Sequence, residues 1–439
     1  MKKDFYQTIT PDDFFDFIKK ATSPYHVVKT CISQLKEHGF EQLDFQTPWK
    51  LIPGGRYYTV PYGTTLFAFT IPKEPSADTI FRITASHTDH PGFRIKNNAE
   101  MFEKDYLKLN VEAYGGAILN TWLDRPLSLA GKVAFKSNNL FSPEIRFVDY
   151  KTPLLSIPNL AIHMNRNINT GIELNKQIDL LPLFGIKGEE DGNGHFFLQF
   201  LADTLNVNAN DILDFDLYLY NPEEPCTFGR NQEFMSSPRL DNLTSVYASL
   251  QALQHSKEQN RDISVAAFYD NEEIGSRTKQ GADSLLTNMF LKKIYDGLNF
   301  TQETFTHSIL KSLLLSTDVA HGFHPNHGEK NDPTNVTQLT KGLVIKWNSS
   351  QKYATDSEAV AIVQQICEAY HIPYQKFVNR SDIPGGGTLG SITSSWLPMK
   401  TVDLGIPLLA MHSARETGSF QDEIALLRLL HAFYNCKRE

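Results

Sequence analysis

The sequence has few cysteines, and none of them is placed to form a metal site or a redox pair. Four occur among 439 residues, and no two of them form a Cys-x-x-Cys pair. They are Cys31, Cys226, Cys367 and Cys436. Zinc sites built from thiolates therefore have no support in this chain. Scattered cysteines are typical of a reducing compartment, and we expect a cytoplasmic protein.

The chain also lacks a long apolar run and an excess of basic residues. No stretch approaches the roughly 20 apolar residues that a membrane-spanning helix needs. The opening MKKDFYQTIT has no apolar segment behind its two lysines, so it does not resemble a signal peptide. The formal net charge is −8, whereas nucleic acids and anionic membranes attract basic surfaces. We therefore expect neither a nucleic-acid partner nor a membrane partner.

Strands and helices are predicted to alternate in two parts of the chain. Thr10 and Ser23 each precede a proline, as an N-cap precedes proline at the first helical position. LFAFTIP and TIFRITASH are typical of strands. Further strands are expected at 263–269, 312–318 and 400–405, and further helices at about 240–255, 356–370 and 421–435. This alternation predicts an α/β fold with a central, mostly parallel sheet flanked by helices.

A different pattern occupies residues 92–232. Short strand-like pieces such as YLKLNVEAYG and DFDLYLYN alternate there with Gly, Pro and Asn turns. We interpret this stretch as a β-rich domain inserted into the α/β domain. The α/β domain would then consist of residues 1–91 and 233–439.

Five segments place His, Asp or Glu at or just beyond predicted strand ends or at a helix start. They are TASHTDHPGFR (His87, Asp89), SSPRLDNLTS (Asp241), YDNEEIGS (Glu272, Glu273), STDVAHGFHPN (Asp318, His321, His324) and LAMHSARET (His412). Each alone has an ordinary structural explanation, such as a helix cap or a solvated turn. Together they are harder to dismiss, because one edge of a parallel sheet can gather them. Carboxylate and imidazole ligands suit Zn²⁺, Mn²⁺ or Co²⁺, and two such ions can activate a water.

Seven motifs occur in one order over residues 86–418. They are SHTDHPGFRIK, RLDNL, DNEEIGS, STDVAHGFHPN, IKWNSSQKYATD, RSDIPGGGTLGSI and DLGIPLLAMHSARET. Together they resemble the aspartyl aminopeptidase family, metallopeptidase family eighteen. The resemblance implies that Asp241 bridges two divalent metal ions, with Zn²⁺ expected and Co²⁺ or Mn²⁺ as alternatives. His87 and Asp318 would complete one metal, and Glu273 and His412 the other.

The resemblance also implies catalytic roles for three further residues. Glu272 would be the general base that takes a proton from the attacking water. Asp89 would hold and orient a metal ligand without binding the metal itself. His163 in PNLAIHMNR would reach a neighbouring subunit's site and help stabilise the oxyanion.

The substrate pocket is expected to involve Lys346 and the loop 381–390. The loop contains Gly386 and Gly387, and His324 would also contact the substrate. The same loop satisfies the G-x-G-x-x-G pattern of dinucleotide sites, but Pro384 adjoins its first glycine and no strand leads into it. We therefore interpret it as a backbone loop that approaches the substrate closely. His90 stands where the family often has serine, and we treat it as accessory.

The function implied by the resemblance is metal-dependent removal of the N-terminal residue, acidic or neutral, from peptides with a free N-terminus. The family resemblance also implies a homododecamer built from dimers through the insertion. Two alternatives remain open. The same dimetal layout serves carboxypeptidases and deacylases, and a chain of this fold can also be a non-catalytic assembly protein.

The adjacent glutamates of FYDNEEIGS raise an electrostatic question, because neighbouring carboxylates repel each other. We expect extended backbone there, which turns successive side chains in opposite directions. Glu273 would then bind a metal while Glu272 faces the water and substrate. Asp270 is expected to be structural or to support a neighbouring ligand, and not to bind a metal itself.

Overall fold

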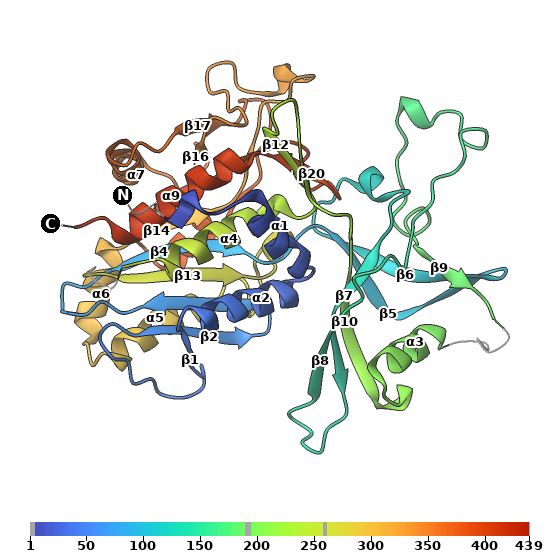
Figure 1. Cartoon of the computed structure of the whole chain (residues 1–439), viewed down its shortest axis with the longest axis horizontal. Helices are drawn as coiled ribbons and strands as arrows, with labels where there is room; N and C mark the ends of the chain where they lie inside the picture. The colour runs from blue at the N-terminus through green and yellow to red at the C-terminus, as the bar shows by residue number, and fades with distance from the viewer. Residues whose placement is uncertain (1–4, 189–194, 258–260, 439) are drawn as a thin grey trace.

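The computed structural model describes residues 5–188, 195–257 and 261–438. Residues 189–194, within the predicted insertion, lie outside these ranges. Two large sheets occupy separate regions of the described chain (Figure 1). One has nine strands and the other six. In the described ranges no helix combines the length and the apolar character that crossing a membrane requires.

The nine-stranded sheet is the core of the α/β part. Its strand order is β1 (Glu41–Gln42), β2 (Arg56–Tyr62), β3 (Thr65–Thr70), β13 (Ile263–Tyr269), β4 (Phe81–His87), β14 (Leu313–Thr317), β18 (Lys400–Gly405), β16 (Leu343–Trp347) and β17 (Tyr374–Val378). The central strands β13, β4, β14 and β18 pair in parallel. Antiparallel pairs join β3 to β13 and β16 to β18. The predicted α/β fold with a mostly parallel central sheet is confirmed.

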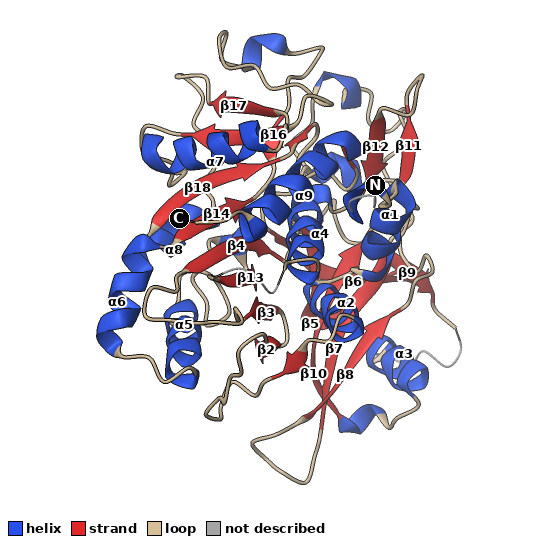
Figure 2. Cartoon of the chain, turned by 60° about the vertical axis from the view of Figure 1, so that its left-hand side comes forward, coloured by secondary structure: helices blue, strands red, loops and turns tan. Residues whose placement is uncertain are grey.

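Helices cover both faces of this sheet (Figure 2). One face packs against α1 (Pro11–Lys20), α2 (Pro24–Glu37), α4 (Leu240–Gln254), α7 (Ser357–Ala369) and α9 (Phe420–Asn435). The other packs against α5 (Leu286–Gly297), α6 (Gln302–Lys311) and α8 (Leu389–Trp396). Alternate residues of one strand serve the two cores: Phe268 faces the first and Tyr269 the second. Strands β4, β13 and β14 are buried at every position, as parallel strands covered on both faces must be.

Local sequence signals explain where the first helices begin. The Thr10 hydroxyl accepts the backbone N–H of Asp13, and the Asp13 carboxylate accepts the N–H of Thr10. This reciprocal pair satisfies two N–H groups that the first helical turn leaves unpaired. The second helix begins at Pro24, directly after Ser23, as predicted.

The six-stranded sheet lies wholly between residues 92 and 220. Its order is β8 (Glu144–Asp149), β7 (Ser128–Phe135), β10 (Ile212–Tyr220), β5 (Gly92–Glu103), β6 (Tyr106–Tyr114) and β9 (Leu183–Ile186), and every pair is antiparallel. With α3 (Phe196–Leu205) it encloses a separate apolar cluster. The domain limits at 92 and 232 remain a prediction.

Several short elements lie outside the two large sheets. One small sheet joins β11 (Cys226–Phe228), β12 (Phe234–Ser237) and β20 (Glu416–Gly418), and β15 (Ala320–His321) pairs with β19 (Pro407–Leu408). Single 3₁₀ turns occur at Phe5–Gln7, Leu119–Trp122, Ile168–Thr170, Ala209–Asp211, Glu272–Ile274 and Gly328–Lys330. Strands β12 and β20 therefore place the segment before α4 beside the segment that follows His412.

Candidate metal centre

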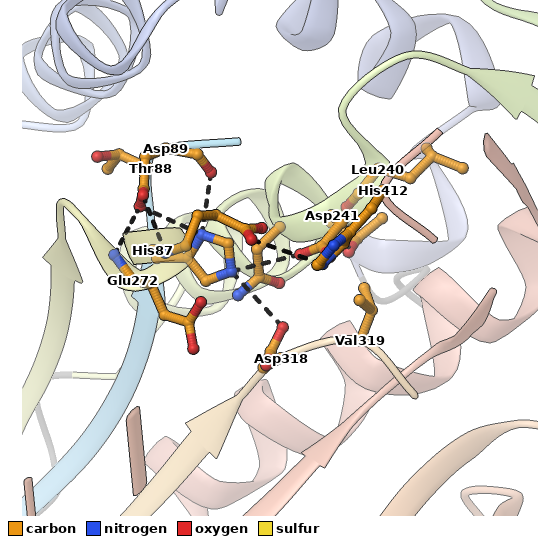
Figure 3. Close-up of polar contacts among 12 residues, drawn as sticks. His87, Thr88, Asp89, Leu240, Asp241, Glu272, Asp318, Val319 and His412 are labelled. Atoms are coloured by element: carbon orange, nitrogen blue, oxygen red, sulfur yellow. Dashed lines mark hydrogen bonds and ion pairs between the residues drawn. The ribbon is translucent and has the colours of Figure 1, made fainter. Parts of the chain in front are cut away.

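The five predicted segments meet at one edge of the nine-stranded sheet (Figure 3). His87 is the last residue of β4 and lies opposite Tyr269, the last residue of β13. Asp318 directly follows β14. Asp241 comes from the start of α4, and His412 from the loop between β19 and β20.

The Asp241 carboxylate lies between two imidazoles. Its Oδ1 is 3.3 Å from Nε2 of His87, and its Oδ2 is 3.3 Å from Nε2 of His412. On the first side, Asp318 Oδ1 lies 3.6 Å from His87 Nε2. On the second, Glu273 Oε2 lies 3.5 Å from His412 Nε2. The structure thus brings together two sets of three groups that share Asp241, the same sets that the family resemblance implies.

These groups fit divalent metal ions. In each set the potential ligand atoms all lie within 4.8 Å of one another. Buried oxygens of Asp241 (Oδ1) and Glu273 (Oε1) accept no hydrogen bond from the described residues. Buried carboxylates without hydrogen bonds are costly unless a cation or a proton compensates them. Oxygen and imidazole nitrogen ligands are those of catalytic zinc sites.

The electrostatics of the cluster show how strongly it attracts positive charge. Burial raises the pKa of Glu272 to about 8 and holds that of Glu273 well above its ordinary value. Burial alone would lower the pKa of His87, but the carboxylates of Asp241 and Asp318 beside its Nε2 outweigh burial and raise that pKa well above its usual range. Protons therefore compensate the clustered carboxylates, and a bound cation would do the same.

Asp89 lies behind both the histidine and the glutamates. Its backbone carbonyl is 3.0 Å from Nδ1 of His87. Its carboxylate accepts the backbone N–H groups of Glu272 and Glu273, each at 3.1 Å, and the hydroxyl of Tyr114 at 2.8 Å. Asp89 is thus placed to orient three of the candidate site residues, one of them through its backbone.

The expectation of extended backbone at the two glutamates is wrong. Glu272 to Ile274 form a 3₁₀ turn, and Asn271 before them has a left-handed backbone with φ of 63°. The reason is the Asp89 carboxylate, which draws two successive N–H groups toward itself. The side chains still differ in surroundings, because Glu273 reaches His412 while Glu272 lies near His87 and Asp318. Asp270 lies outside the ligand sets and accepts the N–H of Asn271.

The residues predicted to contact substrate lie in three different settings. Lys346 is buried, its Nζ donates to the Val319 carbonyl at 3.1 Å, and it lies 3.6 Å from Asp318 Oδ2. His324 is half-buried beside His327, with ring centroids 5.1 Å apart. Gly386 and Gly387 are exposed. Their contact with substrate stays a prediction.

His163 does not join the metal ligands of its own chain. It is exposed in an irregular segment of the insertion. That position leaves it free to reach another subunit, which stays a prediction. His90 is half-buried, but both of its ring nitrogens are shielded from solvent; burial lowers its pKa to about 3, and neither nitrogen has a hydrogen-bond partner among the described residues.

One site residue was missed from the sequence. Glu416 is buried, and its carboxylate accepts the backbone N–H of both Asp241 and His412. The available signal was its place in HSARET, four positions after His412. The sequence around Glu416 does not reveal that this short segment pairs with β12, which brings Glu416 close to Asp241.

Comparisons with known proteins identify the family of this chain. The family model described as aminopeptidase I zinc metalloprotease (M18) matches residues 17–434. A probable M18 family aminopeptidase 2 from Clostridium novyi (strain NT) is 43% identical over 425 residues, covering 97% of this chain and 98% of that protein. One from Clostridium acetobutylicum is 43% identical over 421 residues, covering 96% and 97%.

Solved structures match over nearly the whole fold. The complex of Ape4 and Nbr1 contains a chain with a TM-score of 0.92 and 34% identity, covering 96% of this chain and 84% of that one. The S. cerevisiae mApe1 dodecamer gives a TM-score of 0.83 and 26% identity, covering 96% and 95%.

The fold and the clustered imidazole and carboxylate groups define a metal-dependent peptide hydrolase of the α/β class. The chain belongs to the M18 family of zinc aminopeptidases. It is therefore a metal-dependent aminopeptidase.

Proposed function

We propose that this chain uses a dinuclear metal centre, bridged by Asp241, to remove one residue from peptides that have a free N-terminus. The observation that carries the proposal is the placement of one imidazole 3.3 Å from each oxygen of Asp241. His87 and Asp318 would hold one ion, and Glu273 and His412 the other. Zn²⁺ is the expected metal, with Co²⁺ and Mn²⁺ compatible with the same ligands.

Glu272 is assigned the proton transfers. Bound metal ions would supply Lewis-acid polarisation of the peptide carbonyl and lower the pKa of the attacking water. Glu272 would take the water's proton and then deliver it to the leaving amine. Asp89 supports this assignment because it fixes the turn that carries Glu272 through its N–H at 3.1 Å.

Assembly is proposed to complete the site. His163 lies away from the metal ligands of its own chain, in the insertion of residues 92–232, and would act on the oxyanion in a neighbouring subunit. A homododecamer is supported by the similar mApe1 structure, which is a dodecamer. Lys346, His324, Gly386 and Gly387 would contact the N-terminal side chain. We place the enzyme in the cytoplasm on its cysteine content.

The preferred first residue, acidic or neutral, is open in this proposal. Lys346 argues against a simple acidic preference, because its ammonium group already lies 3.6 Å from Asp318. A panel of aminoacyl chromogenic substrates, assayed with Zn²⁺, Co²⁺ and Mn²⁺ added in turn, would rank the residues and the metals.

The same panel with acetylated N-termini separates the alternative hydrolases. An aminopeptidase should lose all activity when the amine is blocked. Retained cleavage of blocked peptides would favour a carboxypeptidase or deacylase. A chain that takes up no metal and cleaves no peptide would be a non-catalytic assembly protein.

A further inference from the structure

Glu416 connects two parts of the centre that are far apart in the sequence. It is the first residue of β20 and lies opposite Ser237 of β12, three residues before the start of α4. Its Oε2 accepts the backbone N–H of Asp241 at 3.0 Å, and its Oε1 accepts that of His412 at 2.8 Å. One buried carboxyl group therefore holds the backbones of two of the three groups, Asp241 and His412, that would bind the metal shared with Glu273.

The backbone at these positions needs such support. His412 has φ of 69°, Ala410 has 55° and Arg239 has 59°, all in the left-handed region that residues with a side chain rarely adopt. Conformations of this kind persist only where the surrounding structure holds them. The His412 carbonyl accepts the N–H of Ile118 at 2.9 Å, but that contact does not reach Asp241.

We propose that Glu416 is a positioning residue that sets the spacing of Asp241 Oδ2 and His412 Nε2, and so shapes the half-site of Asp241, Glu273 and His412. This inference rests on the proposed dinuclear function. Glu416 offers one carboxyl oxygen to each of the two N–H groups, whereas the amide of a glutamine has a single acceptor oxygen. The other half-site shares Asp241, but its remaining groups, His87 and Asp318, make no hydrogen bond to Glu416.

The test replaces Glu416 with glutamine, which keeps the size but turns one acceptor into an NH₂ group facing an N–H donor. We expect the affinity of one of the two metals to fall about 10- to 100-fold, the usual effect of removing a partner that orients a ligand. The metal at His87 and Asp318 should bind nearly as in the wild type, because it shares only Asp241 with the affected half-site. Competition with a chelator gives both affinities, and the visible spectrum of the Co²⁺ form should show a changed geometry at one ion only.

Glu423→Gln is the matched control. Glu423 on α9 is an equally buried glutamate of the same domain, and its carboxylate has no hydrogen-bond partner among the described residues. It should leave both metal affinities and the Co²⁺ spectrum unchanged. A further variant, Glu416→Asp, keeps both acceptor oxygens, so its loss of metal affinity should be smaller than that of the glutamine variant. Some loss should remain, because the side chain is one methylene shorter.

Each outcome separates this inference from the proposed function. A wild-type chain that binds no metal overturns both. If the wild type binds two ions and Glu416→Gln matches it in affinity and spectrum, Glu416 does not position the half-site. Equal effects of Glu416→Gln and Glu423→Gln would overturn the inference as well. If Glu416→Gln does not fold, Glu416→Asp decides: an unchanged affinity and spectrum refutes the role.

Discussion

Replacing Glu272 with glutamine tests the assignment of the general base. The substitution keeps the side-chain volume and the backbone N–H that Asp89 accepts at 3.1 Å, so the 3₁₀ turn should persist. Within the described residues no side-chain hydrogen bond of Glu272 is lost. The structural cost should therefore be small, and the measured effect should report proton transfer.

The expected loss follows from general-base catalysis. Such a group contributes about 10²- to 10⁴-fold, which corresponds to about 3–5 kcal/mol of transition-state stabilisation. We expect kcat to fall in this range while the protein keeps its full metal content, because no ligand of either proposed metal has changed. Turnover of one free peptide and elemental analysis of the same sample give both quantities.

The neighbouring glutamate supplies the control. Glu273→Gln removes a proposed ligand that lies 3.5 Å from His412 Nε2, so it should lower metal content as well as turnover. The two variants change the same chemical group one position apart and should differ in metal content. A Glu272→Gln enzyme with more than about a tenth of wild-type kcat would refute the base assignment.

Three further predictions concern stability. Removing metal from the wild type should lower the melting temperature reversibly, because each ion present at 100 times its dissociation constant adds about 2.7 kcal/mol to the free energy of unfolding. An unchanged melting temperature would contradict metal binding. Burial lowers the pKa of His26 to about 4, so protonation of this histidine favours the unfolded state. The free energy of unfolding should therefore fall by up to about 3 kcal/mol as pH drops from 6.5 to 4. Urea unfolding of His26→Gln should show a flatter dependence of that free energy on pH. In Gly405→Ala the new Cβ would lie 1.9 Å from the Asp318 carbonyl oxygen, so we expect the free energy of unfolding to fall by about 1–3 kcal/mol and metal binding to weaken. In the control Gly386→Ala the new Cβ meets nothing within 4 Å, so this variant should unfold like the wild type.

The residues that follow strands were predictable because a simple rule places them. His87 and Asp318 come at the ends of apolar strands, and parallel strands bring such ends to one edge. Asp241 and His412 do not follow strands of the nine-stranded sheet; the sequence grouped them with the other candidates, but only the family motifs assigned them as metal ligands. Periodicity alone would have left the centre incomplete.

What failed depends on contacts between distant segments. The turn at Glu272 and Glu273 is set by Asp89 from a different strand, so no local pattern could predict it. Lys346 is buried against Asp318, and its expected place in the substrate pocket stays a prediction. Glu416 matters only because β12 and β20 pair, which a short loop motif does not reveal.

Strand β4 sits between β13 and β14, and this order has a consequence for synthesis on the ribosome. Arg82 of β4 bonds Asp262, 180 positions later, next to the start of β13. At ordinary translation rates that interval lasts roughly 10–40 s. During this interval β4, which is buried on both faces in the folded protein, is exposed on the nascent chain, because β13 and β14 have not yet been translated. We expect the insertion to fold in this interval around its own apolar cluster, while the first 91 residues depend on chaperones. The yield of active enzyme would then depend on protecting that early segment rather than on the stability of the finished fold.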